Sequence, residues 1–160
     1  MFRWLFRFVL LLSISVWIGS VVFFSAVVAP DAFGVLGRSA AGSFLSRIFP
    51  HYYLLGTACG LAALAATVLL LLLDSGFRFL RAVQMAVLVL MLAGNVYAGT
   101  ILEGRIHRLR EEREATTDRT RRGVIDGDFA RLHRRSVTLN LAVLALGMIG
   151  LGSAVERRRG

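Results

Sequence analysis

The chain has 160 residues, of which 56% are apolar, and a formal net charge of +9. This apolar content is too high for an ordinary soluble protein, and the length fits a single domain over residues 1–160. All nineteen basic residues are arginines. Because they flank apolar runs, they are typical of side chains anchored at lipid headgroups, and the pattern argues against nucleic acid as a partner.

Four apolar runs are each long enough, or nearly so, to cross a membrane, which takes about 20 helical residues. They cover residues 8–29, 52–73, 79–102 and 137–154. The short turn after residue 73 makes the second and third runs antiparallel neighbours. We therefore predict an all-α, integral membrane, four-helix up-and-down bundle, with the lipid bilayer as its first partner. The first run is too long for the core of a secretory signal, so we expect an uncleaved span.

The first connection contains two prolines. Pro30 is expected to end the first helix, because a proline disfavours helical geometry in the residue before it. Residues 32–49 mix small, apolar and basic side chains, which predicts a short amphipathic helix lying in the membrane interface. Pro50 suits the first position of the second helix.

The third connection is strongly charged. The apolar pattern of the third run continues weakly through Ile106 and Leu109, so the helix is expected to extend into water. Residues 111–125 are mostly charged or polar and predict a flexible linker. Asp126 and Asp128 then offer N-cap oxygens for a fourth helix that starts outside the membrane.

Polar side chains fall on one side of the fourth helix at its entry into the membrane. His133, Ser136 and Asn140 form a single stripe at helical spacing, and Asn95 lies within the third run. Lipid offers an amide no hydrogen-bond partner, so these groups must face other helices. We interpret Ser136, Asn140 and Asn95 as a polar stripe for helix packing.

Connectivity places the first and third connections on the same side of the membrane. His51, Glu103 and His133 then lie at one end of the bundle. Imidazole and carboxylate groups together suit a transition metal, and a histidine pair could hold haem iron. A metal site formed by these three residues is thus the alternative to a packing role, which needs no cofactor. No motif for an enzyme is present, and we expect a protein without catalytic activity.

Three segments together resemble one family. They are WIGSVVFFSAVVAP in the first run, AAGSFLSRIFPHYYLLG into the second and FARLHRRSVTLN into the fourth. They are similar to the transmembrane protein 205-like family, domain of unknown function 4149. The resemblance implies a small multi-pass membrane protein without an established activity in its bacterial members, and therefore a location in the bacterial plasma membrane.

Orientation and function stay open at this point. The side with the first and third connections has twelve of the nineteen arginines, which favours the cytoplasm for that side. One hypothesis is a non-enzymatic protein that assists transport, membrane homeostasis or assembly of a partner, with a homo-oligomer or a membrane protein as that partner. The other is a metal- or haem-binding protein with its ligands at the bundle end.

Overall fold

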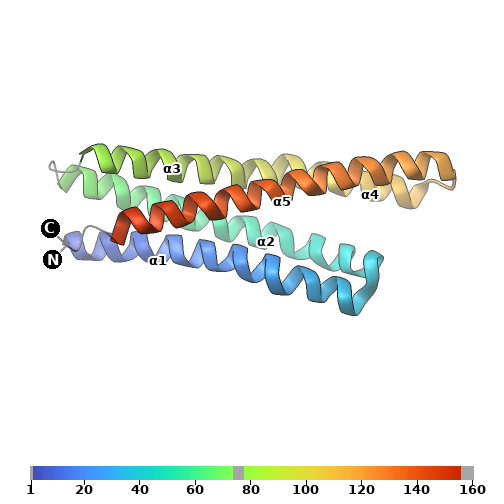
Figure 1. The fold of residues 1–160 in the computed structure, drawn as a ribbon, viewed down its shortest axis with the longest axis horizontal. Helices are drawn as coiled ribbons and strands as arrows, with labels where there is room; N and C mark the ends of the chain where they lie inside the picture. The colour runs from blue at the N-terminus through green and yellow to red at the C-terminus, as the bar shows by residue number, and fades with distance from the viewer. Residues whose placement is uncertain (1, 74–77, 156–160) are drawn as a thin grey trace.

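The computed structural model describes residues 2–73 and 78–155, and these residues form an all-α bundle (Figure 1). The elements are α1 (Phe2–Phe23), the π-helix η1 (Phe24–Val28), α2 (Ala29–Leu73), α3 (Arg78–Tyr97), the π-helix η3 (Ala98–Leu102), α4 (Glu103–Ala115) and α5 (Arg119–Val155). Four long helices run alternately up and down, so α1 begins at the end of the bundle where α5 ends. The predicted four-helix bundle is confirmed.

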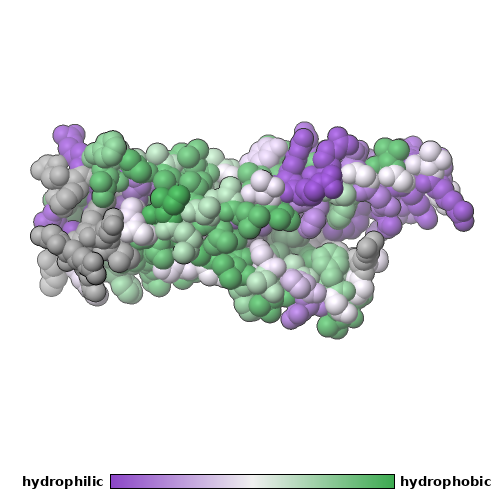
Figure 2. All heavy atoms as spheres, viewed as in Figure 1, coloured by the Kyte–Doolittle hydropathy of each residue, from purple (hydrophilic) through white to green (hydrophobic). Residues whose placement is uncertain are grey.

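Four continuous helices are long and apolar enough to cross a membrane. They are Phe2–Gly37, Ser39–Leu73, Arg78–Ala115 and Arg119–Ala154. Many large apolar side chains point outward from them; Leu72 is 76% exposed and Phe79 78% exposed. Figure 2 shows a hydrophobic surface over the bundle and a hydrophilic one over α4 and the start of α5. The outward apolar surface is what lipid would cover.

The buried faces of the helices repeat at steps of three and four residues. On α1 the buried large side chains are Leu10, Ile14, Trp17 and Val21. On α3 the buried face also includes polar groups, and its members are Arg81, Gln84, Leu88, Met91 and Asn95. Alternate steps of three and four are the spacing of helices that pack at shallow crossing angles, as in bundles and coiled coils.

The first connection differs from the prediction. The helix that begins as α1 passes through Pro30 and continues to Gly37, where the backbone leaves the helical region with φ 71° and ψ 171°. A helix resumes at Ser39 and continues through Pro50. Residues 32–49 thus belong to the two helices on either side of Gly37, and the predicted interfacial helix is wrong.

Local geometry explains why the prolines do not end these helices. In η1 the N–H of Ala29 bonds to the carbonyl of Phe24, five residues earlier, so the turn before Pro30 is wider than an α-turn. A widened turn eases the clash between the proline ring and the preceding turn. At Pro50 the flanking side chains Phe49 and Tyr52 both pack on Phe24, which holds the helix in line.

The predicted flexible linker over residues 111–125 is mostly helical. Only residues 116–118 are outside a helix, and the Asp118 carboxylate accepts a hydrogen bond from the N–H of Thr120 at 2.8 Å. The N-cap is thus Asp118, not the predicted Asp126 or Asp128. Arg113 Nε lies 2.6 Å from Asp126 Oδ1, and Asp128 pairs with Arg131. These ion pairs give both aspartates a different role from capping.

Gly37 supplies a direct test of the first connection. Its φ and ψ lie in a region that is essentially restricted to glycine, and a side chain there costs about 1 to 3 kcal/mol. We expect Gly37→Ala to lower the unfolding temperature of the protein in mild detergent. Gly34→Ala is the matched control, because a Cβ at either position meets nothing within 4 Å but Gly34 has a helical backbone. An equal effect of both substitutions would contradict the observed reversal at Gly37.

Candidate functional site at the junction of bundle and projecting helices

An aromatic cluster joins η1 and α2 near the end of the bundle from which α4 projects. The ring of Phe24 lies 5.2 Å from that of Phe49 and 4.7 Å from that of Tyr52, between centroids. Tyr53 lies 5.1 Å from Tyr52 and 5.9 Å from Phe49. Tyr52 and Tyr53 are both buried. Consecutive buried tyrosines place one ring toward η1 and the other toward the remaining helices, since neighbouring residues on a helix point about 100° apart.

Asn95 links α3 to α2 beside this cluster. Its Nδ2 donates to the carbonyl oxygen of Tyr53 at 2.9 Å and to Oγ1 of Thr57 at 3.0 Å. Thr57 in turn donates to the same Tyr53 carbonyl at 2.9 Å. The buried Asn95 amide therefore obtains its hydrogen bonds from a neighbouring helix, as a polar group must when no water is present.

Gly56 makes this approach possible. A Cβ at position 56 would lie 2.6 Å from Oδ1 of Asn95 and 2.8 Å from Nε1 of Trp17, both too close for any side chain. Glycine at this position thus lets α1 and α3 bring polar atoms to the same point on α2. Gly99 serves in a similar way, since a Cβ there would lie 2.7 Å from the ring of Tyr53.

Ser136 and Glu103 complete the junction from α5 and α4. The side chain of Ser136 lies near that of Tyr53, and Glu103 is close enough to act on Tyr53 electrostatically. The half-buried Glu103 carboxyl is also within the field of Arg110 and His107. Arg110 Nη1 donates to the carbonyl of Gly42 at 2.8 Å, which ties α4 to α2. Asn140, the last residue of the predicted stripe, is half-buried one turn deeper on α5.

The three predicted metal ligands do not come together. His51 is exposed, and its Nδ1 lies 3.2 Å from the carbonyl oxygen of Arg47 on its own helix. His133 is exposed, and its ring is parallel to that of Phe129 at 6.4 Å. The Glu103 carboxyl is half-buried and within the field of Arg110 and His107. Within residues 2–73 and 78–155, no group of three or more His, Cys, Asp or Glu side chains is placed to hold a metal ion.

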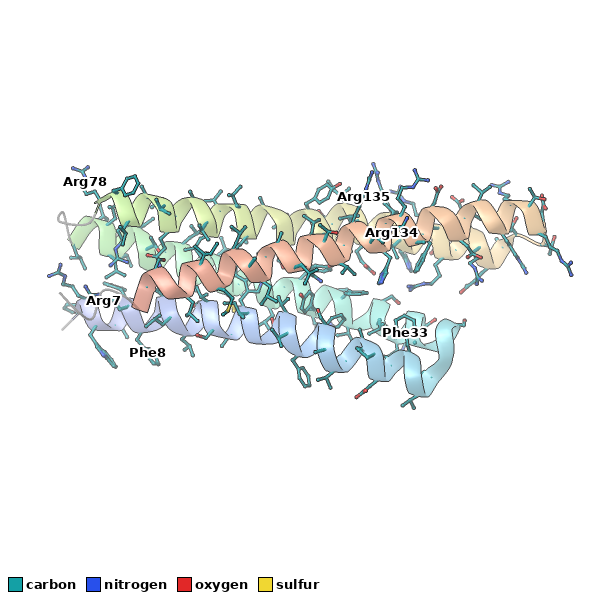
Figure 3. The ribbon with its side chains drawn as sticks, in the orientation of Figure 1. Arg7, Phe8, Phe33, Arg78, Arg134 and Arg135 are labelled. Carbon is teal, nitrogen blue, oxygen red and sulfur yellow. The ribbon has the colours of Figure 1, made fainter. Side chains whose placement is uncertain are left out.

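A buried polar pair that the arginine pattern does not predict lies at the opposite end of the bundle. Arg78 and Arg81 both look like interfacial anchors, but only Arg78 is exposed (Figure 3). Arg81 is 2% exposed and donates through Nη1 to Oε1 of Gln84 at 3.2 Å, and Gln84 is 1% exposed. The overlooked signal is the spacing, because Gln84 lies four residues and Arg81 seven residues before Leu88 on the buried face of α3.

Comparison with known proteins gives one match. Residues 12–115 match a family described as Domain of unknown function (DUF4149). No curated protein and no solved structure matches the chain. The match agrees with the domain family expected from the three sequence segments, while the transmembrane protein 205-like name stays an expectation.

The contact between α2 and α3 gives a second testable prediction. We expect Asn95→Ala to lower the free energy of unfolding in detergent by about 1 to 2 kcal/mol, because two hydrogen bonds between helices are lost. Thr100→Ala is the control, from a neighbouring turn of the same continuous helix. Thr100 is exposed, and its hydroxyl donates to the carbonyl of Val96 within that helix. A loss no larger for Asn95→Ala than for Thr100→Ala would mean that the Asn95 amide does not hold the two helices together.

Proposed function

The chain belongs to the DUF4149 family, and we propose that it is a non-enzymatic assembly protein whose membrane bundle presents a charged hairpin to a partner protein. We define the charged hairpin as α4 and residues 119–135 of α5. The observation that supports the proposal is that this hairpin is ordered and projects beyond the apolar part of the bundle (Figures 1 and 2). Crossing a membrane requires none of these residues.

Specific contacts hold the charged hairpin together. Ile106 on α4 and Ile125 on α5 are 7% and 4% exposed, and Arg113 pairs with Asp126 across the two helices. Arg122 Nε also donates to the carbonyl of Thr116 at 2.8 Å, which closes the turn. Ordering two helices in water costs conformational entropy, and the burial of the spans in the membrane does not offset this cost. A charged surface held in a fixed shape outside the membrane is suited to contact with a partner.

The charge of the hairpin suggests the kind of partner. Residues 105–135 contain ten arginines and six carboxylates. At 1.5 Å per residue, the tip of the hairpin lies about 20 Å beyond the apolar runs, which is more than two screening lengths from the membrane surface at physiological salt. Anionic lipids would have little influence at this distance. The arginines of the tip, Arg119, Arg121 and Arg122, thus favour a protein with an acidic surface.

The polar groups of the junction favour an assembly role over a catalytic or ligand-binding one. Asn95 and Thr57 form hydrogen bonds within the protein, and Ser136 lies near Tyr53, so these groups are already engaged in packing. Both predicted histidine ligands point outward, as described above. We propose the cytoplasm of a bacterial cell as the compartment of the hairpin, because short cytoplasmic connections are enriched in arginine.

Photo-crosslinking in native membranes tests the proposal. A photoreactive amino acid at position 121, exposed at the tip of the hairpin, should give an adduct with one protein of defined mass. The same amino acid at position 78, an exposed arginine at the opposite end of the bundle, is the control. Contact with a partner should make the adduct specific for position 121 and sensitive to added salt, since the attraction is between charges.

The outcome depends on which adducts form. Equal yields from positions 78 and 121, or no protein adduct from position 121, would count against a partner at the hairpin. An adduct of twice the mass of the chain would replace the proposed partner by a second copy of the protein, in agreement with the homo-oligomer considered from the sequence.

A further inference from the structure

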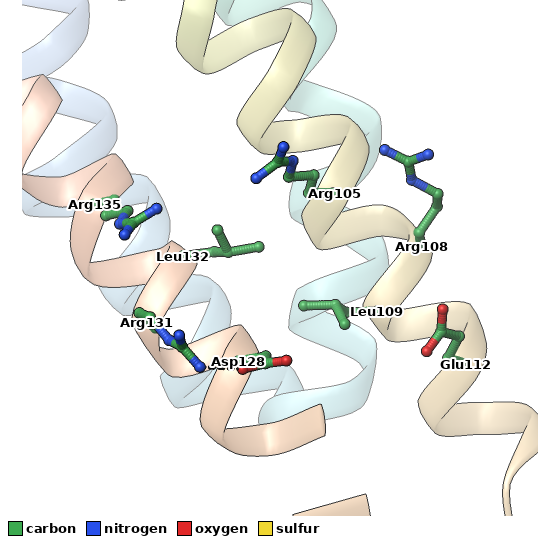
Figure 4. Close-up of a pocket in the computed structure, with 8 residues that line it drawn as sticks. All are labelled: Arg105, Arg108, Leu109, Glu112, Asp128, Arg131, Leu132 and Arg135. Atoms are coloured by element: carbon green, nitrogen blue, oxygen red, sulfur yellow. Dashed lines mark hydrogen bonds and ion pairs between the residues drawn. The ribbon is translucent and has the colours of Figure 1, made fainter. Parts of the chain in front are cut away.

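A groove lies between α4 and α5 where the charged hairpin leaves the bundle (Figure 4). We call it the arginine groove; its volume is about 450 Å³. It has four arginines against two carboxylates, and its lining residues are Arg105, Arg108, Leu109, Glu112, Asp128, Arg131, Leu132 and Arg135. The surplus of cations makes it suited to an anion.

Two of the four arginines are available to a ligand in the gap, since Figure 4 shows Arg108 extending away from it. Figure 4 shows Arg105 and Arg135 reaching into the gap from opposite helices, with Leu109 and Leu132 pointing toward each other between them. Arg131 is already paired with Asp128. In the part of the chain that the structure describes, neither Arg105 nor Arg135 forms an ion pair with a carboxylate. Guanidinium groups bind phosphate oxygens through paired N–H donors.

A second groove adjoins the first on the side of the membrane. Its volume is about 480 Å³ and it shares Arg131 and Arg135 with the arginine groove. Its remaining lining residues are Tyr97, Arg134, Thr138 and Leu139. Thr138 donates its hydroxyl to the carbonyl of Arg134, so this donor is already used within α5. The two grooves together are cationic along their arginines, and Tyr97 and Leu139 give the second groove an apolar side.

The position of the grooves matches the layers of a membrane. Arg105 lies three residues beyond the apolar run that ends at Leu102, and Arg135 lies two residues before the run that begins at Val137. At 1.5 Å per residue, both Cα atoms are about 3 to 5 Å outside the hydrocarbon, within a headgroup layer roughly 5 to 8 Å thick. Tyr97 and Leu139 fall within the hydrocarbon.

We propose that the two grooves bind an anionic phospholipid, with its phosphate between Arg105 and Arg135 and an acyl chain along Tyr97 and Leu139. A free phosphate ion would use only the cationic end, whereas a lipid uses both grooves. The site lies at the base of the hairpin rather than at its tip, so it does not depend on the proposed partner protein.

Native mass spectrometry of the full chain in mild detergent tests this proposal. The probes are phosphatidylglycerol and phosphatidylcholine with identical acyl chains. The wild-type protein should bind phosphatidylglycerol more tightly, and R105Q/R135Q should weaken this binding by about thirtyfold, as expected for two arginines near an anionic headgroup. R119Q/R121Q is the matched control, because it removes the same charge from the tip of the same hairpin and should leave the affinity unchanged.

A variant that is expected to raise the affinity for the lipid strengthens the test. Asp128→Asn releases Arg131 from its ion pair and should raise the affinity for phosphatidylglycerol by about fivefold. Equal losses in R105Q/R135Q and R119Q/R121Q would overturn the proposal in favour of general charge attraction. Equal affinity for the two lipids would overturn it as well. Full competition by soluble glycerol phosphate at the lipid concentration would instead assign the groove to a free anion.

All four substituted arginines and Asp128 are at least partly exposed, so the variants should keep the fold. Unchanged unfolding temperatures of the variants in the same detergent establish that a loss of lipid binding is a loss of the site. The lipid proposal and the partner proposal can fail separately. A negative lipid experiment does not change the adduct expected at position 121, and a missing adduct does not change the expected lipid affinity.

Discussion

Lipid can neither donate nor accept hydrogen bonds, and this constraint governs how the polar side chains of the four spans are arranged. Asn95 shows the consequence most clearly, because its amide bonds to the backbone and side chain of α2. Arg81 and Gln84 lie on the same buried face of α3, where they bond to each other. The polar positions therefore fix which face of α3 turns inward, and the apolar side chains Leu88 and Met91 fill the space between them.

The two π-helices lie close to the junction, and each changes which face the following helix presents. In η3 the N–H of Glu103 bonds to the carbonyl of Ala98, five residues earlier, as Ala29 does with Phe24 in η1. One extra residue in a turn rotates the subsequent side chains by about 100° relative to an uninterrupted α-helix. The widened turn in η1 lets the chain pass Pro30 and keeps Phe24 within the aromatic cluster.

The sequence was sufficient for the architecture, because the length of an apolar run and the position of a short turn are local properties. It was insufficient for the connections, because tertiary contacts decided them. Pro30 and Pro50 are strong local signals for helix ends, yet the positive φ of Gly37 makes the actual reversal. A charged composition over residues 111–125 predicted a flexible linker, and contacts across the hairpin ordered it instead.

In the candidate site, the sequence predicts which side chains face inward only where their position in an apolar run determines it. Asn95 had to face inward, since an amide deep in an apolar run has no other place for its hydrogen bonds. His51 and His133 were free to face either way, because a histidine near the headgroups can reach water. Both turned out to be exposed. Being on the same side of the membrane placed these two histidines at the same level, but it did not place them on facing surfaces of their helices.

The arginines beyond the bundle differ in role according to their distance from the membrane. α5 is continuous from Arg119 to Val155, so the tip of the hairpin and the fourth span belong to one helix. A phospholipid held between Arg105 and Arg135 would join α4 and α5 at the base of the hairpin. Because a small change of tilt at the base becomes a larger displacement about 20 Å away, lipid bound there would fix the direction in which the tip faces its partner. The membrane would then help to position the charged surface as well as anchor it.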